Sequence, residues 1–397
     1  MLNISEQTLG DYMLKGILLT VLTVCVLPVP STYSQQTQTT QAPDLRKAIE
    51  QVDSLAATEI AKDNIGSITI GVVSGGNLMW TKSYGYADIE KKVPATRDNV
   101  YRIASITKQF TALMLLQLVE QGKVHLSDPV EKYVPEINKV QGRFPGAPPI
   151  TLVQLATHTS GLDREPDDEE LKYVLGPVSG WEKMLLAILP RTTYIHEPGT
   201  RYSYSNVGYA VLGLALSRAA SKPYVEYVRE RILTPLKMSH TAFALDEQTK
   251  PNLARGYLIE NGKIDKEAPE RGHQGLGWKV PVGSLYSTVD DLARFVAFEL
   301  GEENANILRR KTLEDNFERV SSAYSDLTYG YGIGFQVRRR GNLTALGHDG
   351  VVAGYQCSAW IDPKTRLGII ALTTRQEKFL GLRALEILAN ANRTSDK

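Results

Sequence analysis

The sequence predicts an α+β fold in which an antiparallel β-sheet, built from both ends of the chain and flanked by helices, carries an inserted, mainly helical domain. Short β-branched runs gather near both ends of the 397-residue chain, and helix signals and proline-bounded loops fill the middle. The composition, with 42% hydrophobic and 22% charged residues, is ordinary for a globular protein. Strands at both ends with helices between them favour a single sheet completed by the two termini.

The first 34 residues have the layout of a secretion signal. Lys15 precedes an apolar run from Gly16 to Val29, and small and polar residues follow it. We therefore expect residues 1–34 to be removed, with Met13 as an alternative start, and residues 35–42 to form a polar linker. The protein is then expected to be exported, either to the periplasm or to the outside. An uncleaved membrane anchor is the alternative.

Residues 43–397 are predicted to form one folded domain. Apolar residues near a 3.6-residue period indicate helices, and β-branched runs separated by a Gly-Gly-Asn turn indicate a hairpin. The expected elements of the first part are, in order, a helix at 43–63, a strand at 67–73, a turn at 74–77, a return strand at 78–86 and a helix at 107–121.

Residues 125–285 read as mixed helix and loop, and strand signals return after them. Thr288 is a candidate N-cap for a helix over 288–300, because Asp290 and Asp291 follow it directly. The remaining expected elements are strands at 332–337, 343–347, 353–362 and 367–373, a turn at 362–365 and a helix at 376–391. We assign 43–104 and 285–397 to the α/β part and 105–284 to the helical part.

Charge and cysteine content exclude several classes of function. The formal net charge is +1, with scattered basic residues, so we expect no nucleic-acid partner. Two cysteines are too few for a disulfide scaffold, and the six histidines show no ligand spacing. We therefore expect no metal and no cofactor. Outside the signal segment no apolar run approaches the length of a membrane span, so no membrane association is expected after its removal.

The first chemical signal is Ser105-Ile106-Thr107-Lys108, which opens the strongest predicted helix. Residues at i and i+3 share one helix face, so the serine hydroxyl and the lysine amine can meet. Serine needs a base to become a nucleophile, and a lysine buried at an apolar helix can lose its proton. The backbone N–H groups at a helix start can also stabilise an oxyanion. Alone, the motif is more typical of a capping serine beside a solvated lysine.

Two further motifs follow. In Tyr204-Ser205-Asn206 the tyrosine is a candidate proton shuttle, and Asn206 can contact a substrate carbonyl and Lys108. The run Gly347-His348-Asp349-Gly350-Val351 lies at a predicted strand edge, where glycines let a backbone approach a ligand. The N–H of Val351 is then a candidate oxyanion donor. The structural alternatives are a helix start for the second motif and a turn for the third.

Together, the order Ser-x-x-Lys, Tyr-x-Asn and a basic residue-x-Gly resembles the serine β-lactamase and penicillin-binding protein superfamily. The tyrosine points to the branch related to class C β-lactamases, which includes D-Ala-D-Ala carboxypeptidases, D-aminopeptidases and esterases. The resemblance extends over nearly all of the chain after the signal. Further similar stretches are 150–162, 282–288 with Asp291-Leu292, and 354–363.

The resemblance implies a role for each residue of the motifs. Ser105 would be the acylated nucleophile, Lys108 its activating partner and Tyr204 the proton shuttle; which of the last two takes the first proton stays open. The substrate-binding residues would be Asn206, His348, Gly350 and Val351. The N–H groups of Ser105 and Val351 would form the oxyanion hole.

Departures from the family pattern bear on the substrate. His348 stands where many relatives carry lysine, and histidine is only partly charged at neutral pH. Asp349 would repel an anion if it faced the site, and an outward orientation is the alternative. Both points disfavour efficient β-lactam hydrolysis. The acidic run 163–170 is expected to be a solvated loop, with a position at the border of the cleft as the alternative.

His158 and Ser160 are interpreted as structural residues, because polar side chains at a helix-to-loop junction commonly bond to backbone. A rival triad of Ser160, His348 and Asp349 conflicts with strand geometry, because adjacent side chains on a strand point to opposite faces.

The sequence therefore predicts an exported serine hydrolase that acts through an acyl-Ser105 intermediate. Its substrate would be a small molecule: a carboxylic ester, a small amide or a D-amino-acid peptide. The alternatives are a β-lactamase and a penicillin-binding sensor that is acylated without turnover.

Overall fold

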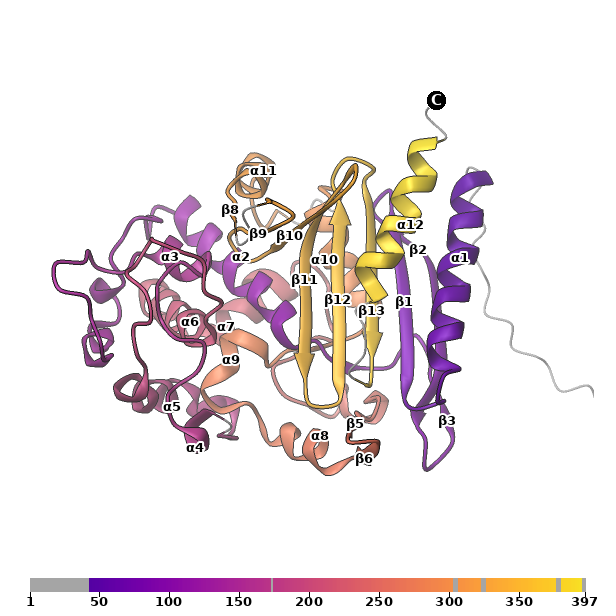
Figure 1. Cartoon of the computed structure of the whole chain (residues 1–397), viewed down its shortest axis with the longest axis horizontal. Coiled ribbons are helices and arrows are strands. Elements are labelled where there is room, and N and C mark those ends of the chain that lie inside the picture. Colours follow the sequence, from indigo (N-terminus) through magenta and orange to yellow (C-terminus); the bar gives the residue numbers. More distant parts are fainter. Residues whose placement is uncertain (1–42, 173, 303–305, 323–325, 376–379, 395–397) are drawn as a thin grey trace, which may run out of the picture. The chain divides into compact units, whose positions relative to one another are not determined.

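The computed structural model describes residues 43–172, 174–302, 306–322, 326–375 and 380–394, all within one unit of the chain, 38–397. The predicted signal segment and linker lie outside these residues. Nine strands form one antiparallel sheet in the order β3-β2-β1-β13-β12-β11-β10-β9-β8 (Figure 1). The strands are β1 Ser67–Ser74, β2 Asn77–Asp88, β3 Val93–Pro94, β8 Ser321–Ser322, β9 Tyr329–Tyr331, β10 Gln336–Arg340, β11 Leu343–Val352, β12 Tyr355–Asp362 and β13 Leu367–Thr373.

The predicted sheet of both chain ends is confirmed by the pairing at its centre. Strand β1, near the start of the domain, pairs with β13, the last strand, with Ile70 opposite Ala371. Short ladders outside this sheet join β4 Tyr101–Arg102 to β7 Tyr286–Ser287, and β5 Leu258–Glu260 to β6 Lys263–Asp265.

Helices cover both faces of the sheet (Figure 1). The first and last described helices, α1 and α12, pack side by side on one face, and α10 packs on the other against β1 and β13. The helices are α1 Pro43–Ile60, α2 Thr107–Glu120, α3 Leu152–Ala156, α4 Glu169–Lys172, α5 Trp181–Ile188, α6 Asn206–Ala220, α7 Tyr224–Val228, α8 Glu267–Arg271, α9 Val280–Gly283, α10 Val289–Glu299, α11 Arg310–Glu318 and α12 Leu380–Thr394. Among these, none is long and apolar enough to cross a membrane.

Alternation along the central strands explains why both faces are covered. In β13, Ile369 packs into the core under α1 and α12, while Ile370 packs into the larger core shared with α2, α6 and α10. A strand that is apolar on both sides must be buried on both sides. Both faces of the central strands are therefore packed against helices and shielded from water.

Two predicted strands differ from the structure. Only the end of the expected strand 332–337 belongs to a strand, β10. Its first residues turn instead, because Gly332 donates to the Phe335 carbonyl (2.8 Å) and Gly334 adopts a φ of +88°. These residues form the turn between β9 and β10. The expected strand 343–347 extends to Val352, so the third motif lies within β11 and the turn follows it at 353–354.

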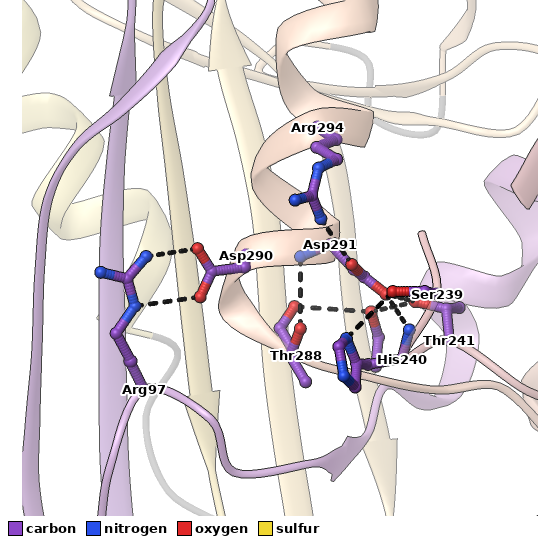
Figure 2. A network of polar contacts seen from close by, with 9 residues as sticks. Arg97, Ser239, His240, Thr241, Thr288, Asp290, Asp291 and Arg294 are labelled. Atoms are coloured by element: carbon purple, nitrogen blue, oxygen red, sulfur yellow. Dashed lines mark hydrogen bonds and ion pairs between the residues drawn. The ribbon is translucent and has the colours of Figure 1, made fainter. Parts of the chain in front are cut away.

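A buried polar network anchors a long loop to α10 (Figure 2). The Asp291 carboxylate accepts hydrogen bonds from the backbone N–H of His240 (2.7 Å), the Thr241 hydroxyl (2.8 Å) and Arg294 (2.8 Å). Thr288 caps the helix by accepting from the Asp291 N–H (3.2 Å), which confirms its predicted role. The network attaches residues 239–241 to the helix that supports the sheet.

Candidate active site

Ser105 lies in a single 3₁₀ turn, Ala104–Ile106, directly before α2. Ala104 has a φ of +47°, an unfavourable conformation for a residue with a side chain. Gly350 of β11 faces this turn. A side-chain carbon at Gly350 would lie 2.2 Å from the Ile103 carbonyl oxygen and 3.1 Å from the Ser105 nitrogen. Only glycine lets the strand pass this close, which brings the exposed Val351 to the edge of the site.

Lys108 is the second residue of α2, is buried, and faces Ser105 as the Ser-x-x-Lys spacing predicts. Its Nζ lies 3.2 Å from Ser105 Oγ and 3.1 Å from the carbonyl oxygen of Val282. Burial lowers the pKa of Lys108 well below its usual range; the nearby cations of Arg164 and Lys279 add to this effect, and Glu165 opposes it. Burial thus favours the uncharged amine, whose lone pair can accept the proton of the serine hydroxyl.

Tyr204 approaches the same hydroxyl from the segment before α6. Its hydroxyl interacts with the Ser105 side chain, and the Lys108 Nζ lies 4.9 Å from its ring centroid. Burial raises the pKa of Tyr204 above its usual value, while the bond to Ser105 and the Arg164 cation act in the opposite direction. Tyr204 is thus a neutral phenol that can donate a proton.

Asn206 begins α6, where the Ser205 hydroxyl caps the helix by accepting from the Gly208 N–H (2.8 Å). The side-chain NH₂ of Asn206 donates to Glu165 (2.6 Å), whose carboxylate also pairs with Lys279 (2.9 Å). Its Oδ1 is buried and has no hydrogen-bond partner among the described residues. The expected contact with Lys108 is absent from the hydrogen bonds of this part of the chain, whereas Glu165 is an additional neighbour.

His348 is buried on β11 and faces the aromatic side chains around Tyr204. Its Nε2 is 3.0 Å from the Tyr331 hydroxyl, and its Nδ1 is 2.5 Å from the carbonyl oxygen of Asp349. Burial, with a further contribution from Lys108, lowers the pKa of His348 to about 3. The imidazole is therefore neutral at physiological pH and does not supply the positive charge that a lysine would.

Asp349 points to the opposite face of the sheet. Its carboxylate accepts hydrogen bonds from the hydroxyl of Ser358 (2.7 Å) and the indole N–H of Trp360 (2.8 Å), and burial raises its pKa. The outward orientation that the sequence left open is the observed one. Asp349 neither repels a substrate anion nor forms a triad with His348.

His158 lies closer to the site than the sequence indicated. Its ring centroid is 4.1 Å from that of Tyr204 and 4.4 Å from that of Tyr331, and its Nδ1 accepts the backbone N–H of Ser205 (3.0 Å). It is fully buried, and burial lowers its pKa well below the usual range. His158 thus keeps a structural role, but the structure that it supports is the one around Tyr204.

The start of the acidic run also borders the site. The Arg164 guanidinium lies 4.9 Å from the Tyr204 ring centroid, and Glu165 bonds to Asn206. Sequence reasoning predicted a solvated loop here, because no local pattern separates these two residues from the acidic residues after them. In the described part of the chain, no group of three or more His, Cys, Asp or Glu side chains is arranged to hold a metal.

The fold and the three motifs define a class, that of proteins built like penicillin-binding proteins. A penicillin-binding protein homologue from Pyrococcus abyssi, an octamer, superposes with a TM-score of 0.74 at 26% identity over 86% of this chain and 77% of its own. Residues 52–392 match the Beta-lactamase family, and the chain belongs to that family.

Other relatives fit the same assignment. Beta-lactamase-like protein 2 of Dictyostelium discoideum is 32% identical over 83% of this chain, and the match spans 59% of the relative's length. EstCE1, a hydrolase with promiscuous acyltransferase activity, superposes with a TM-score of 0.75 at 22% identity over 88% of this chain and all of its own. D-amino acid amidase from Ochrobactrum anthropi gives 0.72 at 22% identity over 89% and 99% of the two chains.

Proposed function

We propose that this protein is a serine hydrolase that cleaves a carboxylic ester or a small amide through an acyl-Ser105 intermediate. The observation that carries the proposal is that Lys108 and Tyr204 both lie next to the Ser105 hydroxyl. A buried amine whose pKa is lowered lies 3.2 Å from Ser105 Oγ, and the Tyr204 phenol interacts with the side chain of the same residue. One group can accept a proton while the other donates one, which is what acyl transfer requires.

The charge states suggest an order of proton transfers. The Lys108 amine takes the proton of Ser105 as Oγ attacks the carbonyl carbon, and the N–H groups of Ser105 and Val351 stabilise the oxyanion. The Tyr204 hydroxyl then protonates the leaving group as its bond to carbon breaks. The Lys108 ammonium returns its proton to the Tyr204 oxygen. Water next attacks the acyl-serine, and the same groups release the acid.

The substrate class follows from the groups that line the site. A neutral His348 holds a β-lactam carboxylate less well than a lysine would, which favours esters and amides over β-lactams. Relatives of the same fold include an amidase that acts on D-amino acids, as its name states, and a hydrolase with acyltransferase activity. A D-amino-acid amide or short peptide therefore stands beside simple esters as a candidate substrate.

A short-chain p-nitrophenyl ester tests the proposal. We expect Ser105→Ala to lower hydrolysis by about 10³-fold or more, because the residual catalysis of nucleophile variants comes from the oxyanion hole and binding alone. Ser54→Ala, on an exposed position of α1, is the matched control and should keep full activity. Equal rates for Ser105→Ala and the unmodified protein would refute the proposal. A stable adduct on Ser105 without turnover would indicate a sensor instead, and a chromogenic cephalosporin measures β-lactamase activity directly.

We also propose that the protein is exported, on the pattern of residues 1–34 alone. N-terminal sequencing of protein from the producing cell should find a start after residue 34, and an intact segment would contradict the proposal.

A further inference from the structure

Arg164 is a permanently charged group beside Tyr204. Its guanidinium carbon lies 4.9 Å from the centroid of the Tyr204 ring, while the side chain as a whole is exposed. Among the described residues the guanidinium has no ion pair and no side-chain hydrogen bond, unlike Lys279, which pairs with Glu165. Arginine keeps its charge at any pH at which the protein is folded.

The backbone holds Arg164 in this place. Its carbonyl accepts the N–H of Asn206 (3.0 Å), and the preceding carbonyl, that of Asp163, accepts the Ser205 hydroxyl (2.7 Å). Glu165 then bonds to the Asn206 side chain. Three successive residues are thus attached to the start of α6, immediately after Tyr204, which fixes the position of the loop relative to the tyrosine.

The other groups around Tyr204 supply little positive charge in the resting protein. Burial lowers the pKa of Lys108 and keeps His348 and His158 neutral, and Glu165 is balanced by Lys279. The titratable and charged groups that face Tyr204 are Lys108 of α2, His158 after α3, Arg164 and Glu165 of the next loop, Tyr202 of its own segment, Tyr209 of α6, Tyr329 and Tyr331 of β9, and His348 of β11.

We propose that Arg164 stabilises the negative charge on the Tyr204 oxygen at the moment when Tyr204 gives its proton to the leaving group. The inference rests on the proposed function. It gives Arg164 the role of a cation near the tyrosinate, because the residue at position 348 is a neutral histidine and not a lysine. In this step the bond between the acyl carbon and the leaving atom breaks, and the leaving atom takes the Tyr204 proton. The tyrosinate stays beside the Arg164 cation until the Lys108 ammonium reprotonates it.

The proposal makes the effect of Arg164 depend on the leaving group. A p-nitrophenolate ion leaves without a proton, so its departure draws little on Tyr204. An alkoxide is strongly basic and must be protonated as it leaves, so its departure requires the tyrosinate to form. Arg164 therefore widens the range of substrates towards alkyl esters and amides, in which the leaving group is poor.

Two esters of the same acid, p-nitrophenyl butyrate and ethyl butyrate, separate the effects, because kcat/KM reports only the steps up to release of the leaving group. Arg164→Gln should lower kcat/KM for the ethyl ester about fivefold and for the p-nitrophenyl ester less than about twofold, the size expected of a cation at an exposed aromatic face. Arg164→Lys should restore most of the loss. Arg201→Gln, an exposed arginine in the same segment as Tyr204, is the matched control and should change neither value.

Rescue by Arg164→Lys is the second readout, because a role in folding alone would not depend on the positive charge at this position. Equal losses on both esters, or a loss confined to KM for a carboxylate-bearing ester, would overturn the inference; the second result would make Arg164 a substrate contact. Failure of the proposed function is distinct, because Ser105→Ala would then keep activity on both esters.

Discussion

Two buried polar clusters of this protein are built differently. Around Asp291 each carboxylate oxygen is bonded, one to Arg294 and the other to the backbone and hydroxyl of residues 240–241 (Figure 2). Around Ser105, by contrast, the Asn206 Oδ1 and the His158 Nε2 are buried without a partner among the described residues. The carboxylate oxygens of the first cluster are both hydrogen-bonded within the chain, whereas the second cluster contains buried polar atoms that can still form hydrogen bonds.

Under the proposed function, this difference separates a cluster that stabilises the fold from one that leaves a donor or acceptor free for a substrate. A buried polar atom without a partner costs about 1–3 kcal/mol, so a chain retains few of them. At the active site the cost is accepted because a substrate and water must find free donors and acceptors there. The comparison therefore predicts that substitutions in the site change activity more than stability, and that substitutions around Asp291 do the reverse.

The largest expected effect is on the Ser105 side of the comparison. Lys108→Met keeps the length of the side chain and removes the amine, so we expect kcat/KM to fall about 10³-fold, within the range of general-base contributions. The free energy of unfolding should stay the same or rise, because methionine buries no polar group. Urea unfolding and ester hydrolysis measure the two quantities. A strongly destabilised Lys108→Met variant would contradict the prediction that substitutions around Ser105 affect activity more than stability.

The next effect is on the Asp291 side. Asp291→Ala leaves the Thr241 hydroxyl and the His240 N–H without their acceptor, and we expect it to lower the free energy of unfolding by about 3 kcal/mol. Activity per folded molecule should be unchanged. Arg97→Ala is the matched control in the same view, because its pair with Asp290 is largely exposed and contributes under about 1 kcal/mol. Equal losses of stability in both variants would contradict the distinction.

The smallest expected effect is on stability, at a third buried polar cluster that joins α2 to α10. Gln109 donates to Glu299 (2.8 Å), and unpartnered oxygens of Gln109, Glu299 and Asn316 line one small cavity. Burial raises the pKa of Glu299 from 4.5 to about 8, while the bond from Gln109 opposes the shift. Between the two pKa values, Glu299 is therefore protonated in the folded protein and ionised in the unfolded chain.

The sign follows from that raised pKa. The stabilisation is complete below the unfolded pKa and is lost as the pH rises through the folded one, at up to about 1.4 kcal/mol per pH unit for one proton. Urea unfolding from about pH 5 to about pH 8 should show this decline, and Glu299→Gln, which resembles the protonated acid, should flatten it. An unchanged slope in the variant would show that Glu299 is ionised in the folded protein.

Much of the fold follows from local patterns. The β-branched run in residues 67–73, the 3.6-residue period of α1 and α2 and the N-cap of α10 predicted main elements, because these signals depend on neighbours in the sequence. The division of β9 from β10 was missed. It depends on the turn at Gly332 and Gly334, whose positions fit a strand equally well when they are read alone.

The sequence by itself determined the family and the pairing of Ser105 with Lys108, because residues three apart on a helix must share a face. Only the tertiary structure decided the charges in the site. The pKa values of Lys108 and His348 are lowered because distant segments remove both groups from water, and Arg164 reaches Tyr204 because its loop is bonded to the start of α6. A pKa depends on what surrounds a group in three dimensions, and the order of residues does not contain that information locally.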